Sequence, residues 1–481
     1  MDRNQASSRS RKPAPPQAAS LKPFSPVDTA WSLDQALLED VRCPEEEEDS
    51  NQCLVLSGLP PIYRPRPFLI DMSGPERWLF QYYVERLSGL LVNAIGHENP
   101  LRSLIVPRLL SSPLLLQTVC AVSALHRSSY ADGDERTTYQ TAATGYYVQA
   151  LADLRDLILQ GDTLLSDSGL LQIVLLSSIF LCKYEIIKDG VTSWRRHLEG
   201  LESFSRLLEG DAWGASMPDI MVFSQSFITY HKGIASLTEQ GVSIMEPDES
   251  FQSTRHDAFS DTLGQNTYLQ AVDPYMGFSR SLIVLLRRVM GLLSFKLEDG
   301  RVLPRVKLEI KSIVDLLSRR NWTAEHFLIP KGMTQETVGR LEHVSRAYES
   351  AVYACLHSMI EELSAREGTA EVWEELRGML PVSKEAALTG CLADIGLVPC
   401  DCPEEAGLLP VLFIVACETD SPEQMTTVLR RVTVLEAHVG LGNIRYAAAL
   451  LREVWQRRIQ LQRWQDWRGL LATSNWDLII T

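Results

Sequence analysis

The chain has 481 residues and a formal net charge of −15, with 45 % apolar and 22 % charged residues. This is ordinary globular composition, and it allows a large buried core. The excess of acidic residues argues against a protein that coats nucleic acid, because phosphate binding needs local positive charge. The nine cysteines are too few and too scattered for a disulfide scaffold.

Residues 1–66 differ from the rest in being rich in proline, serine and charge. Such a segment cannot bury enough apolar surface to offset the entropy of ordering, so we expect a disordered tail. Within its acidic part, 28–49, lie apolar residues of the kind found in transcriptional activation segments: Trp31, Leu33, Leu37, Leu38 and Val41. A solvated tail that contacts nothing is the alternative. The basic run from Arg9 to Lys12 is compatible with a nuclear import signal.

No apolar run of the signal-peptide type begins the chain. Three internal stretches are strongly apolar: 170–187, 282–295 and 408–416. Lys183 and Glu185 interrupt the first, Arg287 and Arg288 the second, and the third is too short to span a bilayer. We therefore expect buried core helices in a soluble, intracellular protein with reduced thiols.

From residue 67 onward the apolar pattern has helical spacing. The first helix is expected after a cap at Ser73, with Trp78, Tyr82, Leu87 and Leu91 on one side. The next are expected at 114–125, 137–160, 168–188, 192–209 and 219–239. A polar loop is expected at 241–273. Further helices are expected at 275–296, 307–319, 338–363, 404–418, 421–438 and 443–468.

No convincing set of alternating strands interrupts this pattern, and no 20–50-residue repeat suggests a solenoid. The sequence therefore predicts an all-α fold. Residues 67–481 should form a single large domain of roughly a dozen helices, preceded by the disordered tail 1–66.

Motifs for catalysis, cofactors or metals are absent from the sequence, so we expect no enzyme and no catalytic, cofactor-binding or metal site. His197 and Glu199 lie two apart on a helix and point to nearly opposite sides. The group Cys391, Cys400 and Cys402 lacks the paired spacing of zinc ligands. Four other cysteines fall on apolar helix faces and should pack as small hydrophobes: Cys120, Cys182, Cys355 and Cys417.

Three groups of arginines lie on expected helices, and each resembles part of a DNA-reading helix. They are 287–288, 319–320 and the series Arg445, Arg452, Arg457 and Arg458. Residues 67–481 nevertheless hold more acidic than basic side chains. We therefore interpret most of these arginines as the solvated faces of packed helices.

Several segments, in order along the chain, resemble the fungal-specific transcription factor domain, the regulatory region of fungal binuclear zinc-cluster regulators. They are 111–130, 145–155, 170–187, 193–209, 408–424 and 454–459. The fourth segment carries the Trp-x-x-His-Leu-x-Gly signature as Trp194, His197, Leu198 and Gly200.

This resemblance implies an all-helical regulatory domain that acts in transcription, with ligand sensing or partner binding as further roles. Trp194 and Leu198 would anchor their helix in the core, His197 would make a local hydrogen bond, and Gly200 would allow close helix contact. None of the four would be a catalyst.

The chain departs from this family in one respect. Such regulators usually begin with six cysteines that hold two zinc ions and place a short helix on DNA. Here the first 100 residues contain only Cys43 and Cys53. DNA binding by that mechanism is therefore not expected of the chain as written. Either an upstream exon is missing from the gene model, or the protein is a regulator without its own DNA reader, or it acts through a DNA-binding partner.

We therefore predict a nuclear, pathway-specific fungal transcriptional regulator that works with the transcription machinery or a DNA-binding partner. A small-molecule effector and a homodimer are left open, and no membrane role is expected. The alternative is a small-molecule-binding or scaffold protein without a direct role in transcription. An enzyme on an all-α fold is the least favoured hypothesis, because no motif supplies a nucleophile, base or metal set.

Overall fold

The computed structural model describes residues 72–93, 99–191, 193–209, 218–239, 272–273, 275–294, 302–320, 332–367, 370–461, 467–474 and 476–481. The expected tail 1–66, with its import signal, activation segment, Cys43 and Cys53, lies outside these residues, as does most of the expected loop. The chain divides into Met1–Gly58 and Leu59–Thr481, and every described residue belongs to the second unit. The described residues contain helices and no strands, which confirms the all-α prediction.

The first helix, α2 (Gly74–Tyr82), begins at the expected cap. Ser73 accepts a hydrogen bond from the Glu76 backbone, and the Glu76 carboxylate accepts one from the Ser73 backbone at 2.8 Å. The chain continues through a π-helical turn, Tyr83–Leu87, into α3 (Ser88–Leu90). Leu87 and Leu91 of the predicted apolar side are buried, which confirms that part of it. At the start of the helix the prediction is wrong by one position, because Leu79 and Tyr83 are buried whereas Trp78 is 43 % exposed.

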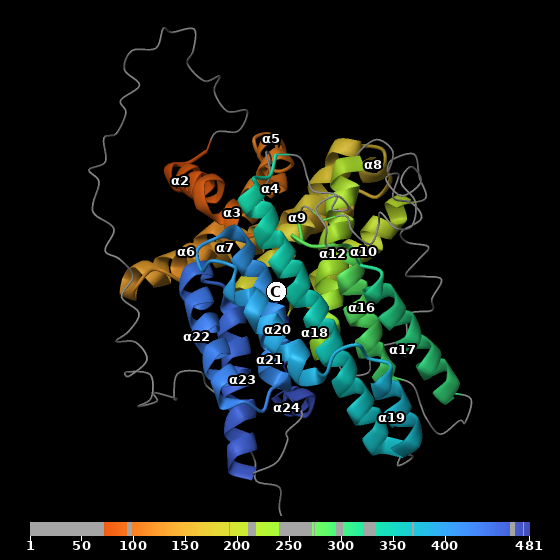
Figure 1. Ribbon diagram of the computed structural model, residues 1–481. Helices are drawn as coiled ribbons and strands as arrows, with labels where there is room; N and C mark the ends of the chain where they lie inside the picture. Colours follow the sequence, from red (N-terminus) through yellow and green to blue (C-terminus); the bar gives the residue numbers. More distant parts are fainter. Residues whose placement is uncertain are drawn as a thin grey trace, which may run out of the picture. The chain divides into compact units, whose positions relative to one another are not determined.

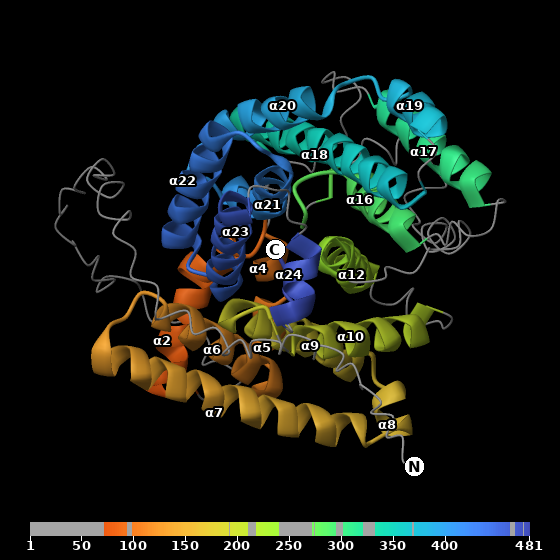
Figure 2. The same ribbon diagram turned by 90° about the horizontal axis from the view of Figure 1, so that it is seen from below.

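Two short helices, α4 (Pro100–Ser103) and α5 (Val106–Leu109), lead into the amino-terminal group of long helices. This group comprises α6 (Pro113–Ser128), α7 (Gly133–Ile158), α9 (Ser168–Lys188), α10 (Trp194–Glu209) and α12 (Pro218–Thr238), with the short α8 (Asp162–Leu165) before α9. Helix α6 packs against both α7 and α9, and α9 packs against α10 and α12 (Figure 2). Helix α9 is therefore central to the group.

Helix α9 is long and apolar enough to cross a membrane by length and composition alone. In the fold, however, 78 % of its most apolar window is buried. Its neighbours α6, α10 and α12 cover it, as expected for the core helix that the sequence predicts.

The carboxyl-terminal group is built around α18 (Gln335–Glu367), which packs against α16 (Arg280–Gly291), α20 (Lys384–Gly396) and α21 (Leu409–Glu418) (Figure 1). The remaining helices of this group are α17 (Val302–Ser318), α19 (Ala370–Gly378), α22 (Pro422–Val439), α23 (Gly442–Leu461) and α24 (Trp467–Ser474). The expected apolar stripe of α18 is buried from Leu341 to Leu363, because those steps of three and four place it on one face.

Two boundaries differ from the sequence prediction. Helix α16 begins at Arg280 rather than 275, because the Asp273 carboxylate accepts hydrogen bonds from the Tyr275 and Met276 backbones and holds a turn there. Of the helix expected at 443–468, α23 is described up to Leu461 and residues 462–466 lie outside the described residues, while α24 runs past the expected end to Ser474. Ile459, placed in the predicted stripe, is 76 % exposed.

The last residues of the chain connect the two groups. Trp194 Nε1 donates to the Asp477 carbonyl at 2.6 Å, and the Ile479 backbone donates to Gly190 O at 2.8 Å. Leu478, Ile479 and Ile480 are completely buried, and both ribbon views place the C-terminus among the helices (Figures 1 and 2). The segment 476–481 is therefore part of the core.

Candidate functional site

A cleft of about 1080 Å³ opens between α18, α20, the junction of α21 with α22, and α24. This volume is in the range of small-molecule sites. Its lining is strongly acidic, with six carboxylates and two basic side chains: Glu361, Glu362, Glu385, Glu418, Asp420, Glu423, Lys384 and Arg468. The cleft is therefore suited to a cationic group or to a basic segment of a partner.

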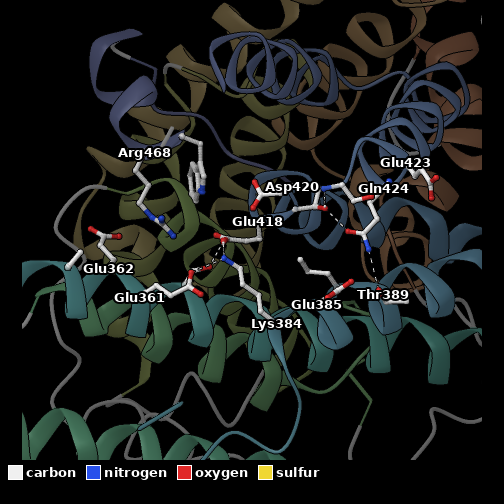
Figure 3. A pocket seen from close by; sticks show the side chains of 16 residues that line it. Glu361, Glu362, Lys384, Glu385, Thr389, Glu418, Asp420, Glu423, Gln424 and Arg468 are labelled. Atoms are coloured by element: carbon white, nitrogen blue, oxygen red, sulfur yellow. Dashed lines mark hydrogen bonds and ion pairs between the residues drawn. The ribbon is translucent and has the colours of Figure 1, made fainter. Parts of the chain in front are cut away.

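One ion-pair group crosses the cleft. Lys384 Nζ lies 3.1 Å from the carboxylates of both Glu418 and Glu361 (Figure 3). Ser358 donates a hydrogen bond to Glu418, whose side chain is only 3 % exposed. Burial alone would lower the pKa of Lys384, but the two carboxylates outweigh it and raise that pKa above its usual range. Lys384 therefore stays charged, and its charge is compensated within the fold.

Local structure explains why Lys384 faces the cleft. Ser383 caps α20 by accepting a hydrogen bond from the Ala386 backbone at 3.2 Å, so that Lys384 is the first residue of the helix. A lysine in a first turn is unfavourable beside the positive end of the helix dipole. The carboxylates of the facing helices α18 and α21 supply the compensation at this position.

Helix α23 holds the end of α21 that carries Glu418. Arg458 donates to the carbonyls of Cys417 at 2.5 Å and Thr419 at 3.2 Å, and Trp455 Nε1 donates to Ala416 O at 2.8 Å. These bonds satisfy carbonyl groups that the helix end would otherwise leave unpaired. The α21 side of the cleft is therefore rigidly positioned.

A second set of side-chain bonds links the junction of α21 and α22 to α20. Thr419 Oγ1 donates to Gln424 Oε1 at 2.5 Å, and Gln424 Nε2 donates to Thr389 Oγ1 at 3.3 Å (Figure 3). The cleft lining includes no histidine and no cysteine. Its chemistry is therefore that of binding by charge and hydrogen bonds.

The signature residues that the sequence singled out lie elsewhere, on α10. Trp194 is completely buried and Leu198 nearly so, which confirms their predicted anchoring role. His197 Nε2 is 2.9 Å from the Tyr147 hydroxyl, which confirms its local hydrogen bond. The prediction for Gly200 is wrong, because a side chain at this position would meet open space.

The cysteines act as packing residues where the sequence predicted it, since Cys120, Cys182, Cys355 and Cys417 are all buried. Cys391 and Cys402 are also buried and donate to backbone carbonyls, whereas the exposed Cys400 accepts a bond from Arg431. Across the described ranges, no group of three or more histidine, cysteine or acidic side chains is arranged to hold a metal ion.

The arginines divide into two sets. Arg288, Arg445 and Arg457 pair with carboxylates on their own or neighbouring helices, as expected of helix surfaces. Arg320 and Arg458 are buried instead, and Arg320 donates to Ser279 and Ser281. The interpretation as solvated faces is therefore wrong for these two, because each serves as an internal cross-link.

Sequence reasoning missed the cleft. Lys384 and Glu418 lie 34 positions apart, and no spacing rule relates residues on different helices. The available signal was the segment 408–424, in which Glu418 is the acid that ends an apolar helix. A charged residue at the end of such a run often has a buried partner.

Comparison with known proteins gives one match. The family model described as "Fungal specific transcription factor domain" matches residues 78–481. No curated protein and no solved structure matches the chain.

Proposed function

The chain belongs to the fungal-specific transcription factor domain family, and on this basis we propose that it is a pathway-specific transcriptional regulator that resides in the nucleus. The match over 78–481 is the observation that carries the proposal, because it covers nearly all of the described helices. The family is regulatory rather than catalytic. The cleft lining, without histidine or cysteine, agrees with a binding role.

DNA is reached either through a DNA-binding partner protein or through a zinc-cluster module that these 481 residues do not contain. In the first case the acidic cleft is the contact that we propose, because DNA-binding segments are basic and the cleft carries six carboxylates against two basic side chains. Glu385 and Glu423 on its rim are exposed and so are accessible to a partner.

The test of the proposed function is a deletion strain examined under conditions in which the gene is expressed. The expected result is a change in the transcripts of a limited gene set, together with nuclear localisation of the tagged full chain. Unchanged transcripts combined with cytosolic residence would favour the alternative, a small-molecule-binding or scaffold protein without a direct role in transcription.

The role of the cleft has a separate test in the same strain. The double variant Glu385→Lys/Glu423→Lys should reduce chromatin occupancy and restore the target transcripts poorly. The matched control Glu199→Lys/Asp315→Lys changes two exposed acidic residues on α10 and α17 and should behave like wild type. Equal occupancy of both variants would remove the cleft from the proposal and leave the transcriptional role intact.

A further inference from the structure

Lys183 is a largely buried cation with no counter-ion among the residues that the structure describes. It lies in α9, is 8 % exposed, and forms no hydrogen bond or ion pair with any described residue. Burial lowers the pKa of Lys183 to about 8, and among the described residues only the Cys182 thiol acts in the opposite direction. A buried lysine normally has an acidic partner, because loss of hydration is costly.

Aromatic rings surround the Lys183 amine. Its Nζ lies 5.5 Å from the ring centre of Phe227 and 5.6 Å from that of Tyr275. Such cation–π contacts stabilise a desolvated ammonium group by less than the cost of removing it from water. The rings therefore reduce the cost of burying this charge without neutralising it.

A second polar group of this region also lacks a partner. His231, on α12, is fully buried, and its ring stacks on that of Phe227 with 3.9 Å between the ring centres. Its Nδ1 lies 2.8 Å from the Phe227 carbonyl, to which it must donate, so Nε2 carries the lone pair. That Nε2 is buried and has no hydrogen-bond partner in the described part of the chain. Burial and the Lys183 charge hold the pKa of His231 well below its usual value, so the ring is neutral.

The acid beside Tyr275 is engaged with other groups. The Asp273 carboxylate accepts bonds from Arg280 at 2.8 Å, from Ser226 at 2.6 Å and from the Tyr275 backbone at 2.9 Å. These bonds fix the turn that carries Tyr275, whose ring centre lies 5.6 Å from Lys183 Nζ. The fold therefore positions this ring beside the amine.

We infer that Lys183, with the rings of Phe227 and Tyr275 and the acceptor of His231, forms a binding site between α9 and α12 for a small organic carboxylate. The ligand carboxylate supplies the missing counter-ion to the ammonium group. Its apolar body lies against the aromatic rings, and a hydroxyl on that body would satisfy His231 Nε2. This site is separate from the acidic cleft, and its binding claim stands whether or not the chain regulates transcription.

The test uses the purified full chain and three probes of similar size: benzoate, the uncharged benzyl alcohol and the cationic benzylamine. Isothermal titration should show benzoate binding at least tenfold tighter than benzyl alcohol. Lys183→Met, which keeps side-chain length and removes the charge, should weaken benzoate binding at least tenfold. The matched control Lys188→Met, on the same helix at a lysine paired with Glu185, should leave it unchanged.

Each contrary result overturns the inference. Absence of benzoate binding, equal binding of benzoate and benzyl alcohol, or undiminished binding by Lys183→Met would remove the ligand role. The variant also has a readout independent of any probe. A ligand site predicts that Lys183→Met raises the unfolding midpoint of the free protein, because an uncompensated charge is removed. A lowered midpoint or failure to fold would assign Lys183 a structural role instead.

Discussion

Lys183 and Lys384 are both largely buried lysines in the same helical unit, and the fold treats them in opposite ways. Lys384 has two carboxylates at 3.1 Å, and its pKa is raised. Lys183 lies beside aromatic rings and forms no ion pair with any described residue, and burial lowers its pKa to about 8. A compensated charge is explained by the fold itself. The Lys183 charge, which no described carboxylate compensates, points instead to a ligand that supplies a carboxylate.

The largest effect should come from removing the buried carboxylate of the compensated site. Glu418→Ala leaves Lys384 with only the more exposed Glu361, so we expect a loss of about 3 kcal/mol in the free energy of unfolding. Urea unfolding would measure this loss. Glu423→Ala, at the exposed rim of the same cleft, is the control and should change stability little.

Removal of the cation should have a somewhat smaller effect. Lys384→Met leaves Glu418 buried with only its bond from Ser358 as compensation, and we expect a loss of about 2 kcal/mol by the same measurement. If this variant were as stable as wild type, the ion pair would contribute nothing and the contrast between the two lysines would disappear.

The same substitution at the other lysine should act in the opposite direction. Lys183→Met replaces an uncompensated cation with an apolar side chain of similar length, so we expect a gain of about 1 kcal/mol at pH 7. The sign is the informative quantity here. Loss of stability would mean that the cation–π contacts outweigh the cost of burying the charge.

The smallest effect concerns pH. Because the folded-state pKa of Lys183, about 8, lies below the usual 10.5, the unfolded chain binds more protons between these values. Stability should therefore rise with pH in that window, by somewhat less than 1 kcal/mol between pH 8 and 9. Comparison with Lys183→Met isolates this contribution, and parallel pH profiles of the two proteins would contradict it.

The groups around Lys183 do not titrate in the pH range in which its protonation changes stability. The titratable groups that face Lys183 are Cys182 on its own helix, His231 on α12 and Tyr275 in the turn before α16. Burial raises the pKa of Cys182 to about 12 and that of Tyr275 well above its usual value, and it holds the pKa of His231 well below. The Asp273 carboxylate, which accepts a bond from the Tyr275 backbone, is paired with Arg280.

Sequence alone predicted the helices well, because each long one buries a stripe whose spacing is visible in the chain. Ser73 caps its helix as expected, and α9 and α10 match their predicted ranges within two residues. Such features depend on residues a few positions apart. The α-helical class therefore followed from local pattern.

Contacts between distant segments could not be predicted in this way. Trp194 bonds to Asp477, 283 positions away, and nothing in the sequence of α10 indicates that the end of the chain lies on it. Lys183 is a further example. In the sequence it only interrupts an apolar run, and its lack of a counter-ion becomes visible once α12 and the turn at Tyr275 lie beside it.

The most direct test of the contrast is the titration of both lysines in one sample. Nuclear magnetic resonance of the full chain labelled at lysine Cε would follow the protonation of each amine as the pH changes. The two signals would be assigned by their loss in Lys183→Met and in Lys384→Met. Lys183 should titrate near pH 8 and Lys384 above pH 10.5, and added benzoate should raise the first value alone. Titration of Lys183 at or above pH 10.5 in the free protein would show that its charge is already compensated, and the account would be contradicted.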